Sequence, residues 1–142
     1  MSTIVSKIIY VQEVFSISNS YLASILGYTP TIIRNIKNGK RNVSIKFVER
    51  LATFLEVPID TLLDDGKELI INKDDTFPNS VFLTNLRINS GYTQTELSKA
   101  IGVPITTIAS MEKCSNTPSY KLLSKYSHFF HISLINLLKN NY

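Results

Sequence analysis

The second half of the chain matches the first half at one constant offset, and this internal repeat limits what the chain can fold into. The offset needs no gap, and it pairs Gly27 with Gly102 and the Leu62-Leu63 pair with Leu137-Leu138. Other matched pairs are Leu22 with Leu97, Leu26 with Ile101, Thr31 with Thr106, Ile33 with Ile108, Ile36 with Met111, Phe47 with Leu122, Val48 with Leu123, Phe54 with Phe129, Val57 with Ile132 and Ile59 with Leu134. The repeat predicts two copies of one module, over residues 1–65 and 77–142.

The segment DDGKELIINKDDT lies between the two copies, and residues 66–76 are expected to form a linker. Its acids, its glycine and its lack of helical periodicity are typical of a connecting segment. The embedded run LII is too apolar for a purely solvated tether. Two structures are open for this run: packing on a neighbouring domain, or a short strand.

Within each copy the apolar residues recur at helical spacing, as at Leu22, Ile25 and Leu26. Thr93 with Glu96 forms a capping-box pattern, and Thr29 followed by Pro30 predicts that a helix begins near Pro30. The matched glycines, Gly27 and Gly102, are expected to end the preceding helix in the left-handed backbone conformation. Each copy therefore predicts two short helices joined by a turn of about three residues, the helix-turn-helix plan.

These residues resemble the lambda-repressor-like, or Xre-type, helix-turn-helix family. In the second copy the run GYTQTELSKAIGVPITTIASMEK is similar to the family pattern, through Gln94, Leu97, Gly102, Ile108 and Glu112. The first copy resembles it through Leu22-Ala23, Gly27, Ile33 and the exit Asn38-Gly39-Lys40, although Asn19 stands where a glutamine is usual. The tails LEVPIDTLL and FHISLINLL resemble the family's closing turn and fifth helix.

The resemblance implies an all-α fold, with two tandem five-helix domains joined by a short linker. It also implies that the third helix of a domain enters the major groove of double-stranded DNA. In the first copy the positions that would face bases are Pro30, Thr31, Ile32 and Asn35. Asn35 is the best candidate base reader, because its amide can pair with adenine. The expected phosphate contacts are Asn19, Arg34, Lys37, Asn38, Lys40 and Arg41.

Positive charge is concentrated in the first copy. Between Val14 and Val48 there are five cations and no acid, so the local charge is +5. The matching window of the second copy, Asn89 to Leu123, holds three lysines and two glutamates, for a charge of +1. The net charges of the whole copies have the opposite order. Residues 1–65 contain 7 cations and 6 acids, and residues 77–142 contain 6 cations and 2 acids. The placement of the charge, rather than its total, indicates DNA contact by the first copy.

The second copy departs from the family at the surface that would contact DNA. Pro104 stands where a capping Ser or Thr is usual, and Cys114 replaces the glycine that Gly39 supplies in the first copy. Cys114 is expected to be a small buried side chain. The residues still able to contact DNA are Gln94, Ile105, Thr106, Thr107 and Ser110. The alternative is a retained fold used for dimerisation or for binding a protein partner.

Two apolar clusters suggest either a partner surface or packing between the two domains of one chain. The first helix of the first copy has Val5, Ile9 and Tyr10 where the second copy has Ser80, Thr84 and Asn85. At the other end of the chain, Ile135 and Tyr142 lie beside expected core leucines. Fifth helices often form the dimer contact in the family that the chain resembles.

Composition and the remaining motifs argue against several other classes of protein. The chain of 142 residues has 44% hydrophobic and 18% charged residues, a net charge of +4 and one cysteine, which favours a folded protein of the cytoplasm without disulfides. No membrane span or signal peptide is expected. His128 and His131 have no further ligand near them in sequence, so we expect no metal and no cofactor. No nucleophile or phosphate-loop motif occurs, and we expect no enzyme activity.

The leading expectation is a sequence-specific, DNA-binding transcription regulator, and more narrowly a repressor that occupies promoter DNA. Either one chain spans two half-sites through a linker that extends to about 40 Å, or a homodimer presents its first domains to a palindrome. The small size is similar to that of regulators from phages and other mobile elements. The alternative is a protein-binding inhibitor, such as an antitoxin or an anti-defence protein, that covers a protein partner and represses its own promoter.

Overall fold

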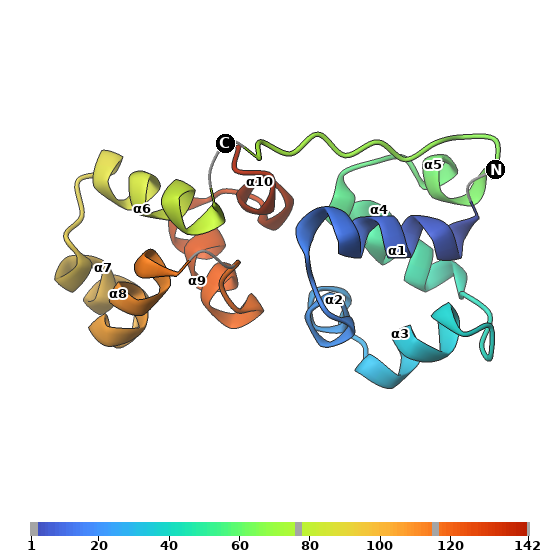
Figure 1. Cartoon of the computed structure of the whole chain (residues 1–142), viewed down its shortest axis with the longest axis horizontal. Helices are drawn as coiled ribbons and strands as arrows, with labels where there is room; N and C mark the ends of the chain where they lie inside the picture. Colours follow the sequence, from blue (N-terminus) through green and yellow to red (C-terminus); the bar gives the residue numbers. More distant parts are fainter. Residues whose placement is uncertain (1–2, 76–77, 115–116, 142) are drawn as a thin grey trace. The chain divides into compact units, whose positions relative to one another are not determined.

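The computed structural model describes residues 3–75, 78–114 and 117–141. Within these ranges the chain forms ten α-helices and no strand (Figure 1). It divides into two compact units, Met1–Asn72 and Lys73–Tyr142. The predicted all-α fold of two tandem five-helix domains is confirmed. No helix in the described ranges is long and apolar enough to cross a membrane.

Corresponding helices of the two units begin at positions that the internal repeat pairs. The helices of the first unit are α1 (Ile4–Phe15), α2 (Asn19–Leu26), α3 (Pro30–Lys37), α4 (Ile45–Leu55) and α5 (Ile59–Leu63). Those of the second unit are α6 (Asn79–Asn89), α7 (Gln94–Ile101), α8 (Ile105–Lys113), α9 (Tyr120–Phe130) and α10 (Leu134–Leu138). The offset that lays Gly27 on Gly102 also lays each helix start of the first unit on its counterpart in the second. The repeat seen in the sequence is therefore a repeat of structure, helix by helix.

The helix ends lie where the local sequence signals put them. Gly27 and Gly102 close α2 and α7 with φ of +76° and +67°, a left-handed conformation that only glycine adopts without strain. Thr93 and Glu96 form the predicted capping box at the start of α7. Thr29 is the residue before α3, as predicted, but its hydroxyl makes no capping hydrogen bond. Three residues separate α2 from α3, and three separate α7 from α8.

The core of each unit is built from matched apolar positions. In the first unit Leu22, Ile33 and Leu51 have no exposed surface, and in the second Leu97 and Ile108 have none. Each buried side chain of this size contributes about 1.5 to 3 kcal/mol relative to exposure in water. Each helix buries one side, which explains why apolar residues recur every three or four residues in both copies.

A cation from the fourth helix of each unit binds the carbonyl end of the second helix. The guanidinium of Arg50 donates from Nη1 to the Leu26 carbonyl at 3.0 Å and lies 5.0 Å from the centre of the Tyr28 ring. The Lys125 ammonium donates to the Ile101 carbonyl at 3.3 Å. A cation at a helix C-terminus satisfies carbonyls that have no partner within the helix. The turn between the second and third helices is held in the same way in both units.

The first and last helices of the two units are joined by different polar side chains. In the first unit the Lys7 ammonium, 2% exposed, donates to the carbonyls of Thr61, Leu62 and Asp64 at 2.8, 3.3 and 2.9 Å. In the second unit the Asn79 amide donates to the Leu137 carbonyl at 2.8 Å and to Asn140 Oδ1 at 2.6 Å. Lys7 is therefore a structural cation, unavailable to any outside partner.

The connecting segment is held by the units at both of its ends. Leu69 is 5% exposed, and the backbone N–H of Ile71 donates to the Tyr10 hydroxyl at 3.0 Å, so these two residues of the run LII pack on the first unit, whereas Ile70 is 68% exposed. Of the two structures left open for this run, packing on a domain is the correct one. At the other end the Asp74 N–H donates to the Lys139 carbonyl at 3.1 Å within the second unit. The described residues of the segment are otherwise mostly exposed.

Three residues that were expected on a partner surface or in the core have surroundings different from those predicted: Tyr10, Ile135 and Cys114. Tyr10 is half-buried and receives the Ile71 hydrogen bond, and Ile135 is 1% exposed within its own unit. Tyr142 lies outside the described residues. The expectation that Cys114 is buried is wrong, because Cys114 is exposed. It follows α8 with φ of −85° and ψ of 149°, an extended backbone conformation.

Replacing Lys7 with methionine is expected to lower the free energy of unfolding of the first unit by about 2 kcal/mol, because three carbonyls lose a charged donor. Urea unfolding of the full chain, followed by circular dichroism, measures the change. Lys67→Met is the matched control, since Lys67 is exposed. An equal effect of the two substitutions would contradict the structural role of Lys7.

Replacing Tyr126 with phenylalanine is expected to raise the free energy of unfolding of the second unit by about 1 kcal/mol. The Tyr126 side chain has no exposed surface, and its hydroxyl has no hydrogen-bond partner among the described residues. Phenylalanine keeps the packing and removes the unsatisfied group. The same urea experiment tests this, and a loss of stability would show that the hydroxyl is bonded.

Candidate nucleic-acid interface

In the first unit, α3 turns its apolar side inward and leaves the rest of its surface to solvent. Ile33 and Ile36 are 0% and 2% exposed, which fixes the rotation of the helix about its axis. Of the predicted base-facing residues, Pro30 and Thr31 are exposed, and Ile32 and Asn35 are half-buried. Arg34 is also exposed. The sequence-predicted residues of α3 therefore share the surface that Ile33 and Ile36 leave free.

The chain leaving α3 turns back onto the end of the helix. The backbone N–H groups of Lys40 and Arg41 both donate to the Asn35 carbonyl, at 2.9 and 3.2 Å. Gly39 permits this turn with a φ of +74°. The turn keeps Asn38, Lys40 and Arg41 beside the last turn of α3, and the two cations among them are exposed. Two cations are thereby added to the charge that Arg34 places on the helix.

The second unit presents a different surface on the equivalent helix, α8. Ile108 and Met111 are buried, at 0% and 7% exposed, so the rotation of the helix matches that of α3. The predicted contact residues Ile105, Thr106, Thr107 and Ser110 are all exposed, with Ile105 at 41%. None of them is charged. Cys114, at the position that corresponds to Gly39, has an extended backbone with φ of −85°, whereas Gly39 has a φ of +74°.

Three polar side chains meet where the first three helices of the first unit converge. The Lys37 ammonium donates to Gln12 Oε1 at 2.7 Å and to Asn19 Oδ1 at 3.0 Å. The Gln12 amide donates to the same Asn19 oxygen at 2.9 Å. We call these three residues the lysine cluster. Asn19 and Lys37 are both predicted phosphate contacts. They are brought together by Gln12, which was not predicted to be a contact and is 8% exposed.

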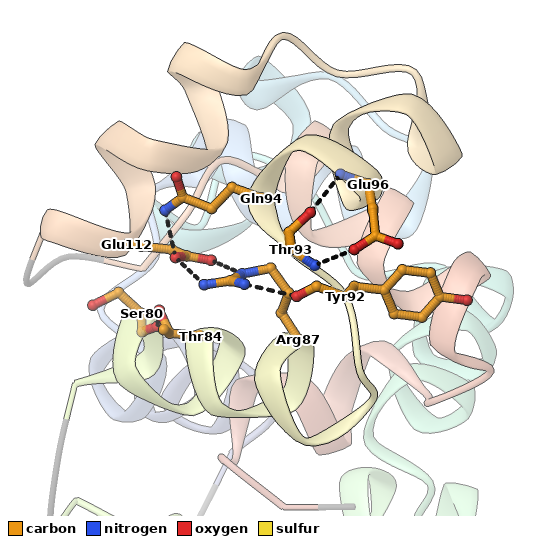
Figure 2. Close-up of polar contacts among 8 residues, drawn as sticks. All are labelled: Ser80, Thr84, Arg87, Tyr92, Thr93, Gln94, Glu96 and Glu112. Carbon is orange, nitrogen blue, oxygen red and sulfur yellow. Dashed lines mark hydrogen bonds and ion pairs between the residues drawn. The ribbon is translucent and has the colours of Figure 1, made fainter.

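The second unit has an ion pair at the corresponding junction (Figure 2). Arg87 donates from Nε and Nη2 to the two carboxylate oxygens of Glu112, at 2.7 and 2.9 Å. Its Nη1 donates to the Tyr92 carbonyl at 2.7 Å. Gln94, a predicted DNA contact, donates to Glu112 Oε1 at 2.9 Å. We call Arg87, Gln94 and Glu112 the ion-pair cluster.

The ion pair shapes the electrostatics inside the second unit. The hydrogen bonds that Arg87 donates to Glu112 raise the pKa of Arg87, against the opposing effect of burial, and the charge of Glu112 raises it further. Burial, and then the charge of Glu112, raises the pKa of Tyr126 well above its ordinary value. Arg87 therefore stays a cation and Tyr126 a neutral phenol throughout the range of pH in which proteins are normally folded.

Sequence reasoning did not identify Gln12 or Arg87 as parts of these clusters. The repeat offered a signal, because the offset that lays Gly27 on Gly102 also pairs Gln12 with Arg87, Asn19 with Gln94 and Lys37 with Glu112. The first and third of these pairs differ in charge, so a search for matching residue types passes over them. Only the convergence of three helices shows that the three positions belong together.

Within the described residues, no group of three or more His, Cys, Asp or Glu side chains gathers at one place. His128 and His131 belong to α9 and its end, and His131 adopts a φ of 55° as the residue that closes the helix.

A family model described as helix-turn-helix matches the chain twice, over residues 15–62 and residues 83–137. The first match falls in the first unit and the second match in the second. No curated protein and no solved structure matches the chain significantly.

Replacing Gly39 with alanine is expected to lower the free energy of unfolding of the first unit by about 1 kcal/mol, because a Cβ is strained in the left-handed conformation. No atom lies within 4 Å of where that Cβ would stand, so the cost is one of backbone conformation and not of collision. Gly39→Asn is the matched control, since asparagine adopts positive φ more readily. Equal losses for alanine and asparagine in urea unfolding would contradict this explanation.

Proposed function

The chain belongs to the Xre-type helix-turn-helix family, and on that premise we propose that it is a sequence-specific DNA-binding transcription regulator, a repressor that occupies promoter DNA. Domains of this family are DNA-binding and not enzymatic in type. DNA is the expected partner, and a place of action in the cytoplasm is part of the proposal.

The observation that carries the proposal is the exposed basic surface around α3. Arg34, Lys40 and Arg41 are all exposed, and the described residues show no ion pair for any of them. Hydrogen bonds from the backbone N–H groups of Lys40 and Arg41 to the Asn35 carbonyl hold the backbone of these two residues beside the end of α3. Cations gathered on one side of an exposed helix match the phosphates that flank a major groove.

Within this surface we assign separate roles to base contacts and phosphate contacts. Asn35, one turn along α3 from Thr31, pairs with adenine through its amide, and Thr31 and Ile32 meet thymine methyl groups. Pro30 is the first residue of the helix and is exposed beside these contacts. The proposed phosphate contacts are Asn19, Arg34, Lys37, Asn38, Lys40 and Arg41. Phosphate contacts fix the register of the helix, and base contacts select the sequence.

For the second unit we propose a supporting role. Ile105, Thr106, Thr107 and Ser110 offer methyl and hydroxyl groups but no charge, and Gln94 is held by Glu112. The Ile71 N–H is bonded within the first unit and the Asp74 N–H within the second, which favours a short connection over a long tether between half-sites. We therefore favour a homodimer that presents two first units to a palindrome, with the second unit contributing to pairing.

A second candidate function is a protein-binding inhibitor, such as an antitoxin or an anti-defence protein. The observation that favours it is apolar surface on the second unit: Val81 and Ile88 of α6 are 39% and 55% exposed, and Ile105 of α8 is 41% exposed. In this case the first unit would still bind DNA, to repress the gene for the inhibitor itself. Loss of partner binding on Ile88→Ser, with DNA binding intact, would support this candidate.

Selection of bound sequences from a pool of genomic DNA, at two salt concentrations, tests the proposed function. A regulator of this kind is expected to enrich one sequence, and its affinity for that sequence should fall steeply as salt rises. Enrichment of no sequence at either concentration would overturn the proposal. Measuring the mass of the complex on the enriched duplex then separates a dimer from a single chain.

Lys40→Ala combined with Arg41→Ala is expected to weaken binding to DNA of every sequence. The slope of log affinity against log salt concentration should become less steep by about 2, one for each lost phosphate contact. Asn35→Ala should instead relax the preference at one base position. Lys99→Ala combined with Lys113→Ala removes the same charge from the second unit and serves as the control. If only the control weakens binding, the second unit and not the first contacts DNA.

A further inference from the structure

We propose that the second unit contains a binding site for a small aromatic carboxylate, in a hollow beside the turn between α7 and α8. The hollow has a volume of about 250 Å³ and is lined by residues of that turn, of α8 and of the beginning of α9. In the first unit, aromatic side chains of the chain itself occupy the corresponding place. The inference goes beyond the proposed function, which gives the second unit only a supporting role.

In the first unit, three side chains pack together beside the turn between α2 and α3. The ring centroids of Tyr28 and Phe47 are 5.2 Å apart, and the Arg50 guanidinium lies 5.0 Å from the centre of the Tyr28 ring. Arg50 also approaches Gly27 closely, because a Cβ added at Gly27 would stand 3.2 Å from the Arg50 Nη1 atom. Phe47 is buried and Tyr28 is half-buried. Two rings and a guanidinium therefore occupy the space beside this turn.

The second unit has smaller side chains at the same three positions. The internal repeat pairs Tyr28, Phe47 and Arg50 with Val103, Leu122 and Lys125. These three residues of the second unit all line the hollow. A Cβ added at Gly102, the counterpart of Gly27, would meet no atom within 4 Å. The smaller side chains thus explain why the space that is filled in the first unit is open in the second.

The apolar part of the hollow suits an aromatic ring. Val103 and Leu122 are its most buried lining residues, at 8% and 6% exposed, and Pro104 adds an exposed apolar side chain. A cavity of about 150 Å³ with apolar walls is large enough to hold benzene, so a hollow of this size accepts one ring with a small substituent. The Tyr28 ring shows that the same backbone plan accommodates a six-membered ring at this place.

The charged part of the hollow suits a carboxylate. Lys121 and Lys125 are one turn apart on α9, and both line the hollow. None of the described lining residues is an acid, and the ion pairs found in the described part of the chain include neither lysine. The Lys125 ammonium uses one of its three N–H donors on the Ile101 carbonyl, at 3.3 Å. A carboxylate attached to a ring in the hollow would therefore meet two cations and no opposing charge.

A ligand in this hollow would supply packing that the second unit lacks. The turn before α8, α8 itself and α9 all contribute lining residues, so one bound molecule would contact all three. In the first unit, the contact of Tyr28 with Phe47 joins the corresponding turn to α4 from within the chain. A molecule that binds the folded unit and not the unfolded chain stabilises the fold. The ligand is therefore expected to stabilise the second unit and leave the first unit unchanged.

Titration of the full chain with benzoate at constant ionic strength, followed by amide NMR signals, tests this inference. Benzoate is expected to cause saturable shifts at the lining residues Gly102, Val103, Thr107 and Leu122. Acetate supplies the carboxylate without the ring, and benzyl alcohol supplies the ring without the charge. Each should bind about tenfold more weakly than benzoate, because each makes only one of the two kinds of contact.

Three variants connect the binding to the hollow. Val103→Tyr with Leu122→Phe installs the rings of the first unit and should abolish the benzoate shifts. Lys121→Gln should weaken benzoate binding about fivefold and leave benzyl alcohol binding unchanged. Lys113→Gln is the matched control and should bind as the unchanged chain does, because Lys113 is an exposed lysine of α8 that does not line the hollow. If the double variant does not fold, Lys121→Gln decides the matter, since Lys121 is exposed.

Several results would overturn the inference. One is the absence of benzoate shifts at the lining residues, and another is benzoate binding that neither the double variant nor Lys121→Gln weakens. Benzyl alcohol binding as tightly as benzoate would show that the hollow does not select an acid. Acetate or inorganic phosphate binding as tightly as benzoate would show a site for anions without a ring, which also contradicts the proposal. The titration contains no DNA, so its failure is distinct from failure of the proposed function.

Discussion

The structure of each unit depends on how polar side chains are satisfied where its first three helices converge. A polar group that is removed from water costs stability unless it is hydrogen-bonded, and a charge costs more. Gln12 and Arg87 occupy this position in the two units, and each is at most 9% exposed. Both are engaged by hydrogen bonds, one with an amide and a lysine, the other with a carboxylate and a backbone carbonyl. The junction fixes the first helix against the pair of helices that follows it.

The two units show that one frame accepts more than one polar solution. Corresponding helices start at paired positions of the repeat throughout, and the buried positions of α3 and α8 match. Yet Lys7 joins the first and last helices in one unit and Asn79 in the other. Because the frame does not require a given charge at these points, the two units can carry different charges there. Lys37 between two amides in the first unit and the ion pair of Arg87 and Glu112 in the second are two such arrangements.

Much of the fold was predictable because its signals are local. Gly27 and Gly102 end helices because a left-handed backbone disfavours other residues, and Thr93 with Glu96 caps a helix through residues that are close in sequence. The apolar spacing of Ile33 and Ile36 predicted that α3 buries one side. Pro30, Thr31 and Asn35 were therefore expected on the other side. The prediction for Cys114 was wrong, since its burial depends on the path of the chain after α8. Whether Lys37 touches DNA was not decided by the sequence, because its neighbours come from two other helices.

The sequence by itself determined the repeat, the helix boundaries, the apolar positions of the core and the concentration of cations around α3, because each follows from periodicity or from a few adjacent residues. Only the tertiary structure decided which of those cations are available to a partner. It buried Lys7 among the carbonyls at the end of α5, held Lys37 between two amides and left Lys40 and Arg41 exposed. The physical reason is that solvation and pairing of a charge depend on atoms distant in sequence, which only folding brings within a few ångströms.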